Sequence, residues 1–146
     1  MARISKESDI PQTPGSLPSN GKTIVLAEDD PFISRMYQAK LTMAGYTVLV
    51  EANGREAYEK IKEVVPDLMM LDLNMPELTG FDILKALQQD NYDFSKSAPI
   101  ILTNSSDPEN IDMAKQLGVE YLIKAELTPK SVLDYINNKL GVKAKG

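Results

Sequence analysis

Three acidic residues lie where two apolar runs end. Glu28 and Asp29 follow the run at 22–27, and Asp72 comes near the end of the run at 67–73. If folding brings them together, two like charges about 4 Å apart repel by roughly 4 kcal/mol at an effective dielectric near 20. Carboxylates stay so close only when a cation or a proton offsets them. An all-oxygen site with open positions suits Mg²⁺, which keeps several of its waters.

Asp72 also has the position of a nucleophile. It lies at the end of a mostly apolar run, before a turn containing Pro76 and Gly80, so a rigid element would position its carboxylate. A phosphoryl group on Asp72 would add negative charge and require a metal ion and a cationic side chain nearby. Thr103 and Lys124, each at the end of a later apolar run, offer a hydroxyl donor and an ammonium. Each alone is typical of turns or solvated surfaces, so the signal is their occurrence at successive strand ends.

Composition narrows the possible chemistry. The 146 residues fit one domain, and a hydrophobic content of 42% is enough for a packed core. The chain has no cysteine and no histidine, which excludes disulfides, cysteine metal sites, and the commonest general base and zinc ligand. A net charge of −5 argues against nucleic-acid binding through this chain alone. No apolar run approaches the roughly 20 residues of a membrane span, so we expect a cytoplasmic protein without membrane contact.

Short apolar runs alternate with helix-period stretches from residue 22 onward. The predicted strands are 22–27, 47–52, 67–73, 99–104 and 119–125, and the predicted helices lie between 31 and 45, 55 and 65, 80 and 89, 107 and 118, and 128 and 141. Asp30, ahead of Pro31, is expected to cap the first of these helices. Residues 1–20, with three prolines, predict a flexible arm before a folded domain at 21–141 and a short tail at 142–146.

The order of these elements predicts a parallel sheet. Five strand–helix repeats joined by crossovers of ordinary length give an α/β fold with helices on both faces of the sheet. In such folds the site lies outside the carboxyl ends of the strands. Residues capable of chemistry stand at four of these ends, namely Glu28, Asp72, Thr103 and Lys124. The second strand ends in Glu51, which we place outside the site.

The same residues resemble the receiver family of response regulators. The similarity covers residues 22–140 and rests on four motifs, VLAEDDP, LDLNMPELTG, ILTNSS and YLIKA. Asp29, Asp72, Thr103 and Lys124 follow one another at separations of 43, 31 and 21 residues, similar to those of the family. The resemblance implies a doubly wound, flavodoxin-like (βα)5 fold with strand order 2-1-3-4-5.

The resemblance implies a phosphorylation switch within a two-component phosphorelay. Glu28 and Asp29 would hold Mg²⁺, with Glu28 acting through a water. Asp72 would be both a metal ligand and the phosphoacceptor, and Asn74 would offer its backbone carbonyl to the metal. The donor would be a phosphohistidine on a sensor histidine kinase or a phosphotransfer protein, since this chain has no histidine. Such a protein is not an enzyme in the usual sense, because it catalyses only its own phosphoryl uptake and autodephosphorylation.

The resemblance also implies an output step. Thr103 would bind the phosphoryl group and move towards it, and Lys124 would pair with it. Tyr121 matches the family's switch aromatic and would turn inward as Thr103 moves, altering a face that binds a downstream protein. A dianionic group that attracts a hydroxyl and an ammonium is a physical basis for such a bistable loop. We expect a monomer or a phosphorylation-dependent dimer, either as a stand-alone receiver or as a piece of a larger regulator.

Two positions differ from the family pattern. Ala125 follows Lys124 where the family usually has proline, often after a cis bond. A cis bond before a non-proline residue costs about 2.5–4 kcal/mol, so we expect a trans bond or a displaced loop. Asn104 follows Thr103 where the family usually has a small residue. Its amide either narrows access to Asp72 or hydrogen-bonds within the loop.

Two other functions stay open at this point. One is a pseudo-receiver, a protein-interaction domain without phosphorylation, which the substitutions Asn104 and Ala125 leave possible. The other is a magnesium-dependent aspartyl phosphohydrolase acting on small phosphoesters with Asp72 as its nucleophile. That class usually has a second acid two residues after the nucleophile, where this chain has Asn74. No glycine-rich phosphate loop follows the first predicted strand, which argues against a nucleotide-binding fold.

Overall fold

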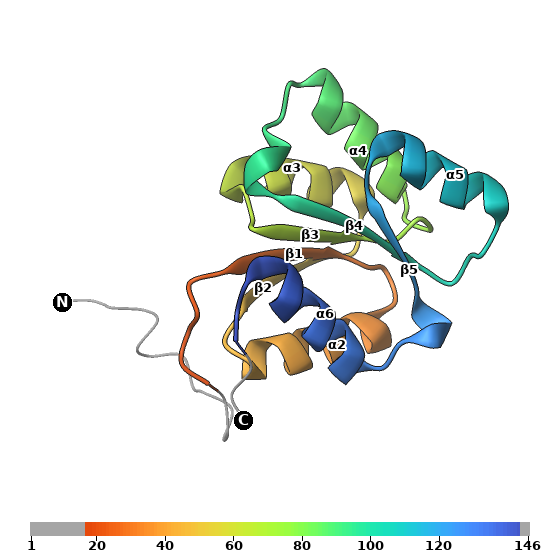
Figure 1. Ribbon diagram of the computed structural model, residues 1–146. Coiled ribbons are helices and arrows are strands. Elements are labelled where there is room, and N and C mark those ends of the chain that lie inside the picture. The colour runs from red at the N-terminus through yellow and green to blue at the C-terminus, as the bar shows by residue number, and fades with distance from the viewer. Residues whose placement is uncertain (1–16, 144–146) are drawn as a thin grey trace.

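Five short strands form one parallel sheet. The computed structural model describes residues 17–143. Its strands are β1 (Thr23–Ala27), β2 (Thr47–Glu51), β3 (Leu68–Leu71), β4 (Ala98–Thr103) and β5 (Glu120–Ile123). They pair in the order β2-β1-β3-β4-β5, with every pairing parallel (Figure 1). The predicted five-stranded parallel sheet and its order 2-1-3-4-5 are confirmed. Residues 1–16 of the predicted arm and 144–146 of the predicted tail lie outside the described residues.

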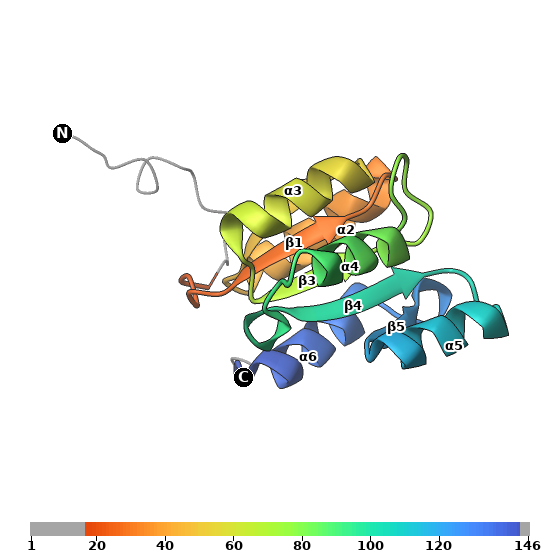
Figure 2. The same ribbon diagram turned by 90° about the horizontal axis from the view of Figure 1, so that it is seen from above.

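Helices cover both faces of this sheet, as predicted. They are α2 (Pro31–Met43), α3 (Gly54–Val64), α4 (Gly80–Gln89), α5 (Pro108–Leu117) and α6 (Pro129–Leu140), with short 3₁₀ turns η1 (Phe94–Lys96) and η2 (Lys124–Glu126). Seen from above, α3 and α4 lie in front of the sheet and α2 and α6 behind it (Figure 2). None of the helices within residues 17–143 is long and apolar enough to cross a membrane.

Local capping signals explain where two of the helices begin. The Asp30 side chain accepts hydrogen bonds from the backbone N–H groups of Phe32, at 2.9 Å, and Ile33, at 3.3 Å, so its predicted capping role is confirmed. The second helix, predicted from residue 55, begins one residue earlier, because the Asn53 side chain caps α3 and Gly54 is its first residue.

The last strand is shorter than the sequence indicates. The predicted strand 119–125 is observed as Glu120–Ile123, and the next residues form the turn η2. Lys124 therefore extends from a turn at the end of β5. The Lys124–Ala125 peptide bond is trans, like the other peptide bonds of the described part of the chain. The expected trans bond is confirmed.

Two apolar cores, one on each face, fix the central strands. Alternate residues of a strand point to opposite faces, so Ile24 and Leu26 of β1 enter one core while Val25 and Ala27 enter the other. The four residues of β3 are buried as well. Burying one such side chain stabilises the fold by roughly 1.5–3 kcal/mol. The carboxyl ends of β1 and β3 therefore rest on the most firmly packed part of the molecule.

The described segment before β1 packs against the end of α2. The backbone N–H of Leu17 donates to the Met43 carbonyl at 2.8 Å, and that of Asn20 donates to the Gly45 carbonyl at 3.0 Å. Gly45 has a φ of +105°, and a Cβ there would lie 2.6 Å from the carbonyl oxygen of Pro18. Glycine is thus required where this segment crosses the helix terminus.

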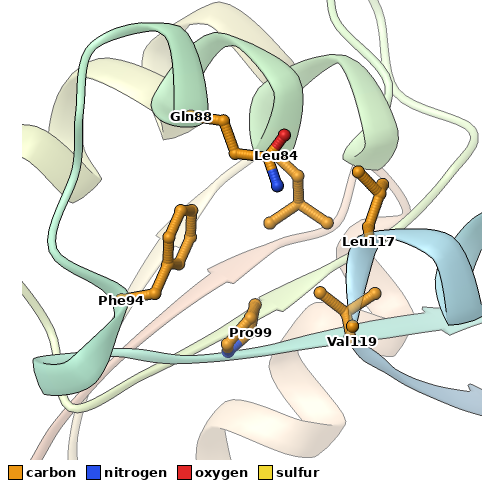
Figure 3. Close-up of a pocket in the computed structure, with 7 residues that line it drawn as sticks. Leu84, Gln88, Phe94, Pro99, Leu117 and Val119 are labelled. Carbon is orange, nitrogen blue, oxygen red and sulfur yellow. The ribbon is translucent and has the colours of Figure 1, made fainter.

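A small pocket of about 250 Å³ opens at the amino end of β4 (Figure 3). Its walls are mostly apolar and come from α4, η1, β4 and the end of α5, with lining residues Leu84, Gln88, Phe94, Pro99, Leu117, Gly118 and Val119. Because it lies at the opposite end of β4 from Thr103, it is separate from the predicted site.

Candidate functional site

The three predicted carboxylates come together at the carboxyl ends of β1 and β3. Each offers an oxygen, and these oxygens lie within 4.8 Å of one another. The parallel register explains this, since Ala27 pairs with Leu71 and the next residues are Glu28 and Asp72. Glu28 and Asp72 are buried, whereas Asp29 is exposed to solvent. Glu51 lies outside the cluster, as expected.

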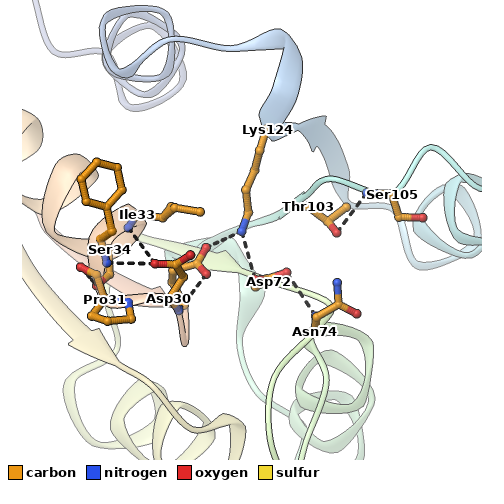
Figure 4. A network of polar contacts seen from close by, with 11 residues as sticks. Asp30, Pro31, Ile33, Ser34, Asp72, Asn74, Thr103, Ser105 and Lys124 are labelled. Carbon is orange, nitrogen blue, oxygen red and sulfur yellow. Dashed lines mark hydrogen bonds and ion pairs between the residues drawn. The ribbon is translucent and has the colours of Figure 1, made fainter.

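Lys124 reaches this cluster from the far edge of the sheet. Its Nζ lies 2.5 Å from Glu28 Oε1 and 3.0 Å from Asp72 Oδ2 (Figure 4). The lysine side chain is only 9% exposed, so both ion pairs are largely shielded from solvent. Removing one partner of such a buried pair is costly because it leaves a charge without compensation.

The charges of the cluster influence one another. Burial raises the pKa of the Glu28 carboxyl, and the charge of Asp72 adds to the rise, against the opposing hydrogen bond from Lys124. Burial disfavours the charged form of Lys124, but hydrogen bonds and attraction to Glu28 and Asp72 outweigh it and raise the pKa of its ammonium. Lys124 thus stays charged at neutral pH. Three carboxylates against one ammonium still leave an excess of negative charge, which suits a divalent cation.

The carboxylate of Asp72 is held at both of its oxygens. Oδ2 accepts from Lys124, and Oδ1 accepts from the backbone N–H of Asn74 at 3.1 Å. The backbone of Asp72 is also tightly packed. A Cβ on Gly80 would lie 2.8 Å from the Asp72 carbonyl oxygen, so the first turn of α4 packs directly against the Asp72 backbone. Asp72 is therefore placed by its neighbours on several sides, which suits a group that must react in one orientation.

Thr103 and Tyr121 meet at a residue that the sequence analysis missed. Thr103 is fully buried at the end of β4, the strand next to β3, and its Oγ1 accepts from the backbone N–H of Ser105 at 3.3 Å (Figure 4). The Tyr121 hydroxyl donates to the Ser105 carbonyl at 2.6 Å. Ser105 also accepts at its Oγ from the Asn110 side chain at 3.0 Å. The only signal in the sequence was a serine two residues after Thr103, a common spacing for hydroxyl turns.

The two residues that depart from the family pattern face solvent. Asn104 and Ala125 are both exposed. The Asn104 side chain forms no hydrogen bond with any residue of the described segment 17–143, so the loop hydrogen bond considered for it is not observed.

Comparison with known proteins identifies the family to which the chain belongs. The model of the response regulator receiver domain matches residues 24–137. The chain belongs to the response regulator receiver family. It is similar to the chemotaxis protein CheY of Thermotoga maritima, with 33% identity over 119 residues, 80% of this chain and 96% of that protein. It is also 30% identical to the transcriptional regulatory protein PhoP of Bacillus subtilis, over 76% of this chain and 45% of that protein.

Solved structures of receiver domains share this fold. The Vibrio cholerae chemotaxis protein CheY4 is 30% identical and superposes with a TM-score of 0.70, over 80% of this chain and 97% of that one. The receiver domain of the Francisella response regulator 1452 is 25% identical and superposes with a TM-score of 0.74, over 83% and 98% of the two chains. The receiver domain therefore spans nearly the whole of its chemotaxis relatives and about half of a longer transcriptional regulator.

Family membership decides the class of function. The protein is a receiver domain of two-component signal transduction, related to phosphorylatable response regulators, and its acidic pocket is present. Receiver domains are signalling switches that interact with histidine kinases or phosphotransfer proteins, and they are not typical enzymes. The phosphohydrolase considered from the sequence is the weaker interpretation for this reason.

Proposed function

We propose that Asp72 is the phosphoacceptor of this receiver domain. The observation that carries the proposal is the buried Asp72 carboxylate within the acidic cluster, 3.0 Å from the ammonium of Lys124. A carboxylate oxygen of Asp72 attacks the phosphorus of a phosphohistidine on a histidine kinase or phosphotransfer protein. The O–P bond forms, the N–P bond breaks, and the histidine of the donor leaves. This chain contains no histidine, so the donor is a separate group.

The same cluster is the proposed magnesium site. Glu28, Asp29 and Asp72 would supply carboxylate oxygens and Asn74 its backbone carbonyl, with Glu28 acting through a water. Oxygen ligands with excess negative charge fit Mg²⁺, and one face of the cluster is open through the exposed Asp29. When bound, Mg²⁺ neutralises charge on the acceptor and phosphoryl oxygens.

Lys124 and Thr103 complete the phosphoryl site in this proposal. Lys124 already lies against the acceptor, so its ammonium would pair with a phosphoryl oxygen. The Thr103 hydroxyl would donate to another phosphoryl oxygen after moving towards it. That movement would break the hydrogen bond from the Ser105 N–H and so disturb the loop that holds Tyr121. The face formed by α5, β5 and α6 would then change its binding to a downstream protein.

The test is phosphorylation by acetyl phosphate with intact mass as the readout. Wild-type protein with Mg²⁺ should gain the mass of one phosphoryl group, and this gain should disappear when EDTA removes the metal. Asp72→Ala should gain nothing while remaining folded by circular dichroism. A phosphoryl adduct on Asp72→Ala would contradict the assignment of the acceptor.

A second function, binding a partner without phosphorylation, is favoured by one observation. The exposed Asn104 side chain lies next to Thr103 and is held by no residue of the segment 17–143, so it can block the approach to Asp72. Folded wild-type protein that takes no phosphoryl group would support this function. In that case Asn104→Ala is the next variant to test.

The wider organisation is also part of the proposal. The receiver domain would extend over 21–141, with an arm at 1–20 and a tail at 142–146. The cytoplasm would be its location, and it would be a monomer or a dimer formed on phosphorylation. Sedimentation of the protein before and after acetyl phosphate treatment distinguishes the two states.

A further inference from the structure

The loop after Asp72 is fastened to the N-terminus of α3. The backbone N–H of Gly54 donates to the Pro76 carbonyl at 3.0 Å, and the N–H of Leu78 donates to the same carbonyl at 2.8 Å. A Cβ on Gly54 would lie 1.8 Å from the Leu78 carbonyl oxygen. Only glycine permits so close an approach, so the loop backbone lies directly on the first turn of α3.

The side chain of Glu77 makes a second attachment at the same place. Its Oε2 accepts from Asn53 Nδ2 at 2.5 Å, and its Oε1 lies 3.5 Å from Arg55 Nε. Asn53 is the N-cap of α3, with its Oδ1 bound to the backbone N–H groups of Arg55 and Glu56. A carboxylate at a helix N-terminus is further stabilised by the helix dipole.

The backbone of Glu77 is in an unfavourable conformation. Its φ is +69°, in the left-handed region that side chains with a Cβ adopt at a cost and glycine adopts freely. Nothing in this backbone favours glutamate, so the contacts of its carboxylate with Asn53 and Arg55 must compensate. An unfavourable backbone conformation and two side-chain contacts with α3 together indicate that Glu77 holds the loop against this helix.

The other end of the loop is fastened to the proposed acceptor. The Asn74 N–H donates to Asp72 Oδ1, and Gly80 packs under the Asp72 carbonyl. Asn74, whose carbonyl is the proposed backbone ligand of the metal, therefore lies between one attachment at Asp72 and another at Glu77. Loosening the attachment at Glu77 would free the segment that carries this carbonyl.

We propose that Glu77 is a positioning residue for the magnesium site. By binding Asn53 and Arg55 it holds the loop against α3, so that the Asn74 carbonyl is already in place when the metal arrives. Groups that orient metal ligands raise affinity because less ordering remains to be done on binding. This inference rests on the proposed metal site, and it adds a residue that touches neither the metal nor the phosphoryl group.

The test compares Glu77→Gly with wild type by NMR titration with Mg²⁺ alone. Glycine suits the φ of +69°, so the thermal midpoint should be unchanged or higher. The Mg²⁺ dissociation constant, read from amide chemical shifts, should nevertheless rise by about threefold to tenfold. The N–H groups of Gly54 and Leu78 should exchange with solvent faster, because the loop they tie to Pro76 is looser.

Two further variants test whether the contacts of Glu77 are the cause of the change in Mg²⁺ affinity. Glu77→Gln keeps an oxygen acceptor for Asn53 and should recover most of the Mg²⁺ affinity. Asp134→Ala removes a carboxylate that is 54% exposed, like that of Glu77, from an ion pair with Lys130 on α6. It should leave the Mg²⁺ affinity at the wild-type value.

Three results would overturn the proposal. One is an unchanged Mg²⁺ affinity in Glu77→Gly, and another is a loss of affinity that merely parallels a loss of thermal stability. The third is a wild-type protein that does not bind Mg²⁺, which would refute the proposed metal site itself. The first two leave the metal site standing, so the failures are distinguishable.

Discussion

The centre of the sheet and its β5 edge differ in how firmly they hold their residues. In β1 and β3 nearly every side chain is buried, with exposures of 0–1% for Ile24 to Ala27 and for Leu68 to Leu71. In β5 no residue is buried, and α5 beside it buries only Ala114. The proposed acceptor and metal ligands lie at the firm centre, whereas Tyr121 and the Ser105 loop lie at the loose edge. In the proposed switch, the groups that react are thus firmly packed, and the groups that move are held by few contacts.

Removing Lys124 should have the largest effect, because it joins the edge to the centre. Lys124→Met leaves Glu28 and Asp72 buried without a cation and should lower the free energy of unfolding by about 3–5 kcal/mol at neutral pH. Urea unfolding in EDTA measures the change. Lys130→Met is the matched control, since Lys130 is 74% exposed in its ion pair with Asp134 and should cost below about 1 kcal/mol. Equal losses in the two variants would show that the Lys124 pairs are not effectively buried.

A matched pair of leucines compares the packing of the two regions. Leu26 of β1 is 1% exposed, whereas Leu122 of β5 is only partly buried against the same core. Leu26→Ala should cost about 2–5 kcal/mol in the free energy of unfolding. Leu122→Ala should cost about half as much or less, because part of its side chain already contacts water. The contrast between centre and edge is wrong if the two variants unfold at the same urea concentration.

The region that sequence reasoning described well is the firm one. Apolar runs followed by Glu28 and Asp72 predict β1 and β3, because burial leaves a local pattern in the sequence. The strand order that makes these two strands neighbours was implied by the family resemblance and not by local patterns. At the edge, the apolar run predicts a strand over the whole of 119–125, since apolar periodicity alone does not separate a strand from the turn η2. The contacts of Ser105 and Glu77 were missed altogether. They join polar residues of ordinary type across the fold, and no periodicity marks them.

A buried tyrosine at the firmly packed centre extends the comparison to pH. The Tyr46 hydroxyl donates to Asn137 Oδ1 at 2.6 Å, and burial raises the pKa of Tyr46 to about 12 from the usual 10.0. The folded state binds the Tyr46 proton more tightly than the unfolded state does. The contribution of Tyr46 to stability is therefore fully present below pH 10 and is lost as pH rises from 10 to 12. The loss should be about 2–3 kcal/mol. Urea unfolding across this range should show a loss that is smaller by this amount in Tyr46→Phe than in wild type. A smaller loss remains in the variant, because burial also raises the pKa values of Tyr37, Tyr92 and Tyr135.

At neutral pH, Tyr46→Phe and Tyr121→Phe should differ in how much stability they lose. Tyr46→Phe leaves the buried Asn137 oxygen without its donor and should cost about 1–3 kcal/mol. Tyr121→Phe leaves the Ser105 carbonyl with access to water and should cost about 0.5–1 kcal/mol. The larger effect of Tyr121→Phe should be faster amide exchange in the loop after Thr103, which NMR measures residue by residue. Equal stability losses would mean that the Ser105 loop is as firmly held as the core.

The smallest expected effect is that of Asn104→Ala, which should change the rate of phosphoryl uptake and not the stability of the fold. Asn104→Ala removes an exposed amide that no residue of the segment 17–143 holds, so the free energy of unfolding should change by less than about 0.5 kcal/mol. If this amide narrows the approach to Asp72, phosphoryl uptake from acetyl phosphate should become about threefold faster, which corresponds to a barrier lower by about 0.7 kcal/mol. The exposed Asn138→Ala on α6 is the matched control and should leave the rate unchanged. An unchanged rate in Asn104→Ala would mean that the exposed amide does not obstruct the proposed acceptor. Access to Asp72 would then be set by the firmly packed centre alone, and the loose edge would act only after the phosphoryl group has arrived.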